Sequence, residues 1–207
     1  MTVTGLSSKK GHLVSIELSG GESVLIDKDV VTEECIHEDD ELTPERVRKL
    51  KEKSDYVRAK SRALWLLDRY QYTERRLKDK LRSAGFSDEI SQKAVERLKE
   101  LGVIDDSALA LRFAEECSGR GISKRAAYAK LMQKGFDSGT IKEALQSTDF
   151  DEREQLKELI ERKYASKIAE GETGKVYAAL IRKGFSYNAV RNALKSYGEE
   201  LDYSGDE

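Results

Sequence analysis

One ten-residue pattern decides the fold, because the chain contains it three times. It reads LKDKLRSAGF at residues 77–86, AYAKLMQKGF at 127–136 and VYAALIRKGF at 176–185. In each copy an apolar residue stands eight positions before the glycine and a leucine four positions before it. This is the spacing of one helix face. The Gly-Phe pairs lie 50 and 49 residues apart, so the sequence predicts three related helical units.

The Gly-Phe pair predicts how each of these helices ends. A glycine after the last turn supplies the left-handed residue of a Schellman cap, and the residue after it packs back on the helix. The expected contacts join each phenylalanine to the leucine five positions before it: Phe86–Leu81, Phe136–Leu131 and Phe185–Leu180. A further helix follows each pair, with an N-cap residue directly after the phenylalanine: Ser87, Asp137 and Ser186.

The N-terminal segment has the periodicity of strands. Residues 12–18 alternate apolar and polar side chains, and residues 23–26 return after Gly20-Gly21. Two glycines supply the positive φ angles that a tight hairpin needs. Residues 3–6 add an edge strand. Because so small a sheet is only marginally stable alone, we expect it to pack against the helices that follow.

A long helix is expected after this sheet. Thr43 is a suitable N-cap, Pro44 suits the first helical position, and Glu45 stands beside the positive end of the helix dipole. The stretch up to Lys60 is charged nearly all round, which predicts an exposed arm. Residues 63–67 are apolar and predict entry into a core.

The expected fold class is therefore mainly α, with three tandem three-helix repeats and a small N-terminal β segment. The tight turn within each unit resembles a helix-turn-helix module, which by itself fixes no function. The expected segments follow the chain in order: β segment 1–42, first repeat with a long entry helix 43–104, second repeat 105–149, third repeat 150–198 and acidic tail 199–207.

Charge is distributed unevenly along the chain. Residues 1–45 hold 3 Lys/Arg against 11 Asp/Glu, and residues 46–197 hold 34 against 23. The last ten residues hold five acids and no base. A basic body suits a polyanionic partner. A solvated helical surface without a partner is the plainer alternative.

The sequence shows no catalytic or metal-binding pattern. His12 and His37 have no ligand spacing to each other or to Cys35. Cys35 and Cys117 have no histidine in helical register, and we expect free thiols. Asp105-Asp106 precedes an apolar helical run, so an N-cap and a first-turn acid are expected there. We expect no enzyme, no cofactor and no metal.

The chain also has no pattern typical of a membrane or secreted protein. It contains no run of about 18 apolar residues that would span a bilayer. Residues 1–10 lack the apolar core of a signal peptide. A cytoplasmic protein with no membrane partner is therefore expected.

Basic side chains on the second helix of each repeat are the candidate binding surface, because charge without a fixed pocket suits phosphates or carboxylates. A helical wheel assigns the buried centre of the first copy to three residues: Leu77, Leu81 and Ala84. Arg75 then faces outward, and Arg125 occupies the equivalent position in the second repeat. The candidate binding residues are Arg75, Arg76, Lys78, Arg82, Lys124, Arg125, Lys130, Lys134, Lys175, Arg182 and Lys183. Bases can stack on neighbouring tyrosines, although such tyrosines are more often half-buried core: Tyr72, Tyr128 and Tyr177.

Two stretches, residues 72–86 and 95–106, resemble the signature of the RecX family, whose members regulate the RecA recombinase. The similarity extends from about Arg62 to Tyr197. Two positions depart from the family pattern: Leu109 stands where a phenylalanine is frequent, and Ile122 where a proline is frequent. Both are packing or turn positions, so they weaken the register of the second repeat more than the function.

The resemblance implies a curved, elongated array of three-helix repeats that binds in the groove of the RecA–single-stranded-DNA filament. It implies a modulator, with inhibition of the recombinase, ATPase and coprotease activities as the expected outcome, in homologous recombination, DNA repair and the SOS response. Single-stranded DNA is contacted directly or through the filament, and a monomer is expected. The alternative is a DNA-binding helical protein that acts on recombination indirectly. A peptide-binding scaffold is a third alternative, but it would need an apolar groove, and the helix faces here are basic.

Overall fold

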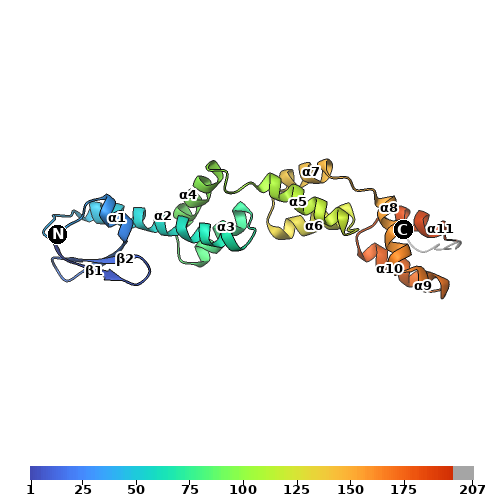
Figure 1. The fold of residues 1–207 in the computed structure, drawn as a ribbon, viewed down its shortest axis with the longest axis horizontal. Coiled ribbons are helices and arrows are strands. Elements are labelled where there is room, and N and C mark those ends of the chain that lie inside the picture. The colour runs from blue at the N-terminus through green and yellow to red at the C-terminus, as the bar shows by residue number, and fades with distance from the viewer. Residues whose placement is uncertain (198–207) are drawn as a thin grey trace. The chain divides into compact units, whose positions relative to one another are not determined.

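The computed structural model of the 207-residue chain describes residues 1–197 and is shown in Figure 1. The described residues form three strands and eleven helices. Their contacts divide the chain into two compact units, the first comprising residues 1–104 and the second beginning at Asp105. The expected acidic tail at 199–207 lies outside the described residues.

The N-terminal segment is a three-stranded antiparallel sheet in the order β1-β2-β3. Its strands are β1 (Val3–Lys9), β2 (Leu13–Leu18) and β3 (Ser23–Asp27). The predicted edge strand and hairpin are confirmed. Gly20 and Gly21 turn the chain between β2 and β3 with φ angles of 117° and 83°. Ile16 and Leu18 of β2 are buried, so one face of the sheet is covered.

Helix α1 (Lys28–Glu33) and the long helix α2 (Pro44–Arg69) follow the sheet. The Thr43 hydroxyl accepts a hydrogen bond from the Arg46 N–H at 3.1 Å, as expected of an N-cap. Figure 1 shows α2 extending from the sheet to the helices of the first repeat. Helix α2 therefore belongs to two cores at once.

The prediction that α2 starts as an exposed arm is wrong. Leu50 is 3% exposed and lies in the core that the helix forms with the sheet. The Ser54 hydroxyl, also buried, accepts the Asp27 N–H at 2.8 Å. Val47 and Val57 pack against the same core. These side chains form a stripe too narrow to stand out among so many charges, but it is wide enough to cover a small sheet.

Three helical repeats account for the rest of the described chain. The first consists of the second half of α2 with α3 (Glu74–Ser83) and α4 (Asp88–Glu100). The second consists of α5 (Asp106–Gly119), α6 (Lys124–Lys134) and α7 (Ser138–Ser147). The third consists of α8 (Glu152–Lys163), α9 (Ala165–Ala169), α10 (Thr173–Arg182) and α11 (Tyr187–Lys195). Each repeat has its own apolar core.

The predicted Schellman caps are present in all three repeats. The glycines have positive φ angles: 96° at Gly85, 94° at Gly135 and 87° at Gly184. Each following phenylalanine donates its N–H to the predicted leucine carbonyl: Phe86 to Leu81 at 3.3 Å, Phe136 to Leu131 at 3.3 Å and Phe185 to Leu180 at 3.4 Å. Each pair lies in the core of one repeat. The predicted N-caps Ser87, Asp137 and Ser186 are also confirmed.

The third repeat differs from the expected three helices, because two helices occupy the place of its first one. Tyr164 adopts φ −122° and ψ −2°, which interrupts helical geometry between α8 and α9. Its side chain is 7% exposed and packs with Ile160 in the repeat core. The chain therefore turns at a buried aromatic residue, which a helical wheel assigns to an uninterrupted helix.

The second and third repeats are joined within the second unit by polar contacts at helix ends. The Ser123 hydroxyl, which caps α6, donates to the Lys183 carbonyl at 3.0 Å. A side chain at Gly184 would place its Cβ 2.7 Å from that hydroxyl oxygen. The glycine therefore serves both the cap of α10 and the close approach of α6.

Candidate functional site

Helix α6 carries the least neutralised group of cations among the candidate residues. Lys124, Arg125 and Lys130 are exposed, and the 11 residues of α6 include no acid. Within residues 1–197, none of these three side chains forms an ion pair. The Lys134 ammonium lies 4.0 Å from the centroid of the Phe113 ring, so part of its charge is directed at an aromatic face.

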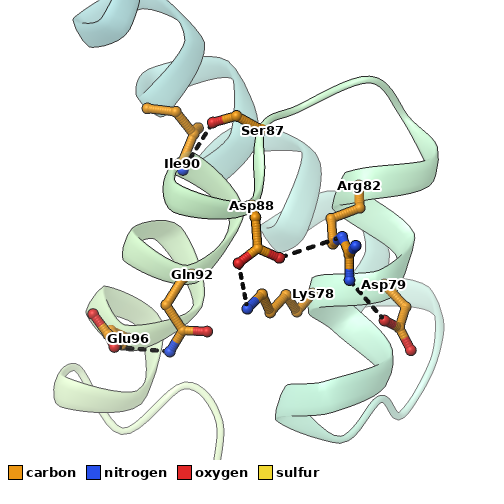
Figure 2. A network of polar contacts seen from close by, with 8 residues as sticks. All are labelled: Lys78, Asp79, Arg82, Ser87, Asp88, Ile90, Gln92 and Glu96. Atoms are coloured by element: carbon orange, nitrogen blue, oxygen red, sulfur yellow. Dashed lines mark hydrogen bonds and ion pairs between the residues drawn. The ribbon is translucent and has the colours of Figure 1, made fainter.

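The cations of α3 have acidic partners instead. Figure 2 shows the Asp88 carboxylate, in the first turn of α4, between two side chains of α3. Its oxygens lie 3.1 Å from Lys78 Nζ and 3.3 Å from Arg82 Nε. Arg82 also approaches Asp79 at 4.0 Å. The α3 surface is thus partly neutralised by its own repeat, and Arg75, Arg76 and Lys80 are further exposed cations of this helix.

Aligning the repeats on their glycines explains the difference between α3 and α6. Ala129 stands at the position of Asp79, and Ser138 at the position of Asp88. The acids that neutralise α3 therefore have no counterparts in the second repeat, and neither do the two cations that they pair with, since Tyr128 and Met132 stand at the positions of Lys78 and Arg82. Arg125 does correspond to Arg75, as the sequence indicates, and both side chains are exposed.

The candidate cations of the third repeat are more constrained. Lys175 donates to Glu172, and this hydrogen bond and the ammonium charge lower the pKa of that carboxyl. Arg182 donates to the Ala178 carbonyl at 3.3 Å on its own helix. Lys183 is half-buried at the junction with α6. These three candidate residues thus offer less available positive charge than the cations of α6.

The three candidate tyrosines are half-buried at the edges of the repeat cores. Tyr72, Tyr128 and Tyr177 each pack against the core of their own repeat. The Tyr177 ring lies 6.3 Å from that of Tyr187. One residue of the predicted buried centre is misplaced: Ala84 is exposed. It is the C-cap of α3, where the chain leaves the helix and turns away from the core.

Sequence analysis missed an aromatic and basic stripe on α2. Trp65 is 44% exposed, and two arginines of the same helix lie over its ring. The guanidinium carbons of Arg62 and Arg69 are 4.5 and 4.2 Å from the ring centroid. The signal in the sequence is the spacing, since residues three before and four after a helical position share its face.

The only group of described residues with metal-binding geometry lies at the sheet, far in sequence from these cations. His12, Asp27 and Asp29 bring their ligand atoms within 4.8 Å of one another. His12 Nε2 and Asp29 Oδ1 are 3.0 Å apart, and Asp27 caps α1 by accepting the Asp29 N–H. An exposed side-chain hydrogen bond and a helix cap account for all three side chains.

None of the helices in the described chain has the length and apolar character to cross a membrane.

Comparison with known proteins identifies the family. Residues 59–98, which include α3 and much of α4, match a family model described as the first three-helix domain of RecX. The regulatory protein RecX of Thermobifida fusca (strain YX) is 31% identical over 161 residues, covering 73% of this chain and 87% of the relative. The chain belongs to the RecX family.

Other RecX proteins extend the similarity to the N-terminal sheet. The regulatory protein RecX of Clostridium botulinum (strain Eklund 17B / Type B) is 26% identical over 204 residues, which is 94% of each chain. A crystal structure of a regulatory protein RecX aligns with a TM-score of 0.69 at 22% identity, over 94% of this chain and 98% of the other. RecX from Lactobacillus salivarius aligns with a TM-score of 0.62 at 23% identity, over 70% and 97%. The predicted RecX resemblance and repeat architecture are confirmed, and RecX membership supports a regulatory role.

Proposed function

We propose that this chain is a non-catalytic regulator that binds in the groove of the RecA–single-stranded-DNA filament. Binding lowers the recombinase, ATPase and coprotease activities of the filament, and so restrains homologous recombination and the SOS response. The RecX resemblance suggests this partner. The observation that carries the proposal is the set of unpaired, exposed cations on α6: Lys124, Arg125 and Lys130.

The geometry of α6 supports contact with an extended anionic surface. Its 11 residues span about 16 Å at the usual helical rise, and its first and last turns both carry a base. Exposed, unpaired cations contribute little to folding. They are therefore available for phosphates of DNA or carboxylates of a protein, whereas Lys78 and Arg82 would first have to leave Asp88.

The non-catalytic part of the proposal is supported by the two thiols. Partial burial raises the pKa of Cys117 and so disfavours the reactive thiolate. Cys35 is exposed on the acidic segment after α1 and is free. We expect the purified chain to show no nuclease, ATPase or protease activity, and ATP hydrolysis to change only when RecA is present. Hydrolysis of DNA, ATP or protein by the purified chain, abolished by one substitution in it, would contradict the non-catalytic part of the proposal.

Direct binding of DNA is the second candidate, and the absence of acids from α6 favours it. A protein that recognises phosphates needs charge and little else, and its affinity falls steeply with salt. In this case the effect on recombination would be indirect, through competition for single strands. Filament binding and binding to the bare oligonucleotide distinguish the two candidates.

Fluorescence anisotropy with a labelled oligonucleotide, alone and coated with RecA, tests the proposal. The variant Arg125→Glu with Lys130→Glu should bind the coated strand at least about tenfold more weakly. Its melting temperature should stay near that of the parent, since exposed charges contribute little to stability. The control is Arg48→Glu with Lys49→Glu, which makes the same charge change on exposed residues of α2.

The salt dependence identifies what the cations of α6 contact. If they face DNA phosphates, the variant should lose part of the salt slope of the parent. An unchanged slope with weaker binding indicates protein carboxylates. If the α6 variant and the α2 control both bind the filament like the parent, α6 is only a solvated surface and the proposal fails.

A further inference from the structure

The exposed stripe on the second half of α2 combines an aromatic ring with ordered cations. Trp65 is the only tryptophan in the chain and is 44% exposed. Leu64 and Tyr70, close by on the same segment, are 43% and 58% exposed. Three large apolar side chains thus face solvent within seven residues. The first-repeat core does not need them, since it is filled by other residues of α2 such as Ala63 and Leu66.

The two arginines of this stripe are held in place by the indole. Arg69 lies 4.2 Å from the ring centroid, donates to the Trp65 carbonyl at 3.3 Å and lies 3.5 Å from Asp68. Arg62 lies 4.5 Å from the same centroid and has no ion pair among the described residues. Both side chains therefore have little conformational freedom left to lose when a partner binds.

The two guanidinium groups approach the indole ring from residues on either side of it along the helix. Arg62 stands three residues before Trp65 and Arg69 four residues after it, about 4.5 and 6 Å away along the helix axis in opposite directions. Two like charges on one ring face would also repel each other. A nucleic-acid base would have to compete with these two cations to stack on the ring, which is how aromatic residues usually bind single strands. The indole edge and the two cations remain available to a partner.

We propose that the Arg62–Trp65–Arg69 stripe, with Leu64 and Tyr70, is a docking site for a protein surface that offers carboxylates around an apolar pocket. Tryptophan, tyrosine and arginine are the residues most enriched at the energetic centres of protein interfaces. The guanidinium pair requires acidic partners, and the exposed apolar side chains require a pocket. This inference rests on the proposed function, because the recombinase is the protein partner used to test it. It adds a contact distinct from the cations of α6.

Fluorine NMR tests the docking site directly. Incorporation of 5-fluorotryptophan labels this chain at Trp65 alone, because there is no second tryptophan. The labelled chain is mixed with a single-stranded oligonucleotide, with RecA, or with the assembled filament. We expect the resonance to shift or broaden with RecA or the filament and to stay in place with the oligonucleotide. A shift with the oligonucleotide alone would overturn the proposal in favour of nucleic acid, and a concentration-dependent shift in the chain alone would overturn it in favour of self-association.

Substitution provides the second arm of the experiment. Trp65→Ala, and separately Arg62→Glu with Arg69→Glu, should each weaken filament binding about tenfold or more while leaving oligonucleotide binding unchanged. Leu25→Ala is the control for the first variant, since Leu25 is 50% exposed on β3. Arg48→Glu with Lys49→Glu is the control for the second. Parent-like filament binding by both stripe variants overturns this inference alone, whereas a parent chain that binds neither RecA nor the filament overturns the proposed function as well.

Discussion

The first and second repeats carry the same cap and the same outward arginine, yet their surroundings differ in two respects. Phe136 is 2% exposed in the core of the second repeat, whereas Phe86 is only partly buried at the edge of the first. Arg82 of α3 pairs with Asp88, whereas Met132 of α6 stands at the equivalent position and is 45% exposed. The backbone plan is therefore shared, but each repeat uses its surface differently.

The two repeats share the residues that form the helical fold and differ in the charged residues on their outer faces. The cap glycine and the buried leucines recur in both repeats because the helical turn needs them. The acids on the outer faces do not recur. In the first repeat they pair with Lys78 and Arg82. The equivalent residues of the second repeat are Tyr128 and Met132, and the cations of α6 stand at other positions without acidic partners.

The largest expected effect concerns the capping phenylalanines. Phe136→Ala should lower the free energy of unfolding by about 3–5 kcal/mol, as expected when a fully buried ring is removed. Phe86→Ala should lower it by less than half of that value, because part of that ring already contacts solvent. Urea denaturation of both full-length variants measures the difference. Equal losses would show that the two caps pack alike.

A smaller effect is expected from transferring the acids of the first repeat to the second. Ala129→Asp with Ser138→Asp places carboxylates at the positions of Asp79 and Asp88. Filament binding should weaken about three- to tenfold, because the two added carboxylates lower the positive potential around α6. Stability should change little, since an acid at residue 138 also suits the first turn of α7. Unchanged affinity in a titration of the filament would show that neutralising α6 has no effect on binding.

The smallest effect belongs to the reverse exchange. Asp79→Ala with Asp88→Ser releases Lys78 and Arg82, and should strengthen filament binding by no more than about threefold. Surface pairs of this kind contribute up to about 1 kcal/mol, so the melting temperature should fall only slightly. Weaker binding by this variant would indicate that Asp88 orders its two cations for the filament instead of withholding them.

Much of this architecture can be predicted from the sequence because it depends on local signals. Gly85 and Gly135 end helices for a conformational reason that any chain obeys, and the buried leucines follow from helical periodicity. The break at Tyr164 is not predictable in this way, because it depends on where a buried ring fits in the third core.

The candidate surface is less accessible to sequence analysis, because charge pairing depends on contacts between helices. Asp88 follows Lys78 by ten residues and neutralises it only because α3 and α4 pack together. The burial of Leu50 likewise depends on a sheet formed earlier in the chain. A helical wheel shows which residues face outward but not which of them already have a partner.

An electron-microscopy map of the RecA filament with this protein bound tests the central claim most directly. The account predicts that α6 lies against the filament, with Lys124, Arg125 and Lys130 in contact with DNA phosphates or recombinase carboxylates. Asp88 should still pair with Lys78 and Arg82 in the bound state. A map in which α6 faces solvent, while the filament is held by other parts of the chain, would contradict the account.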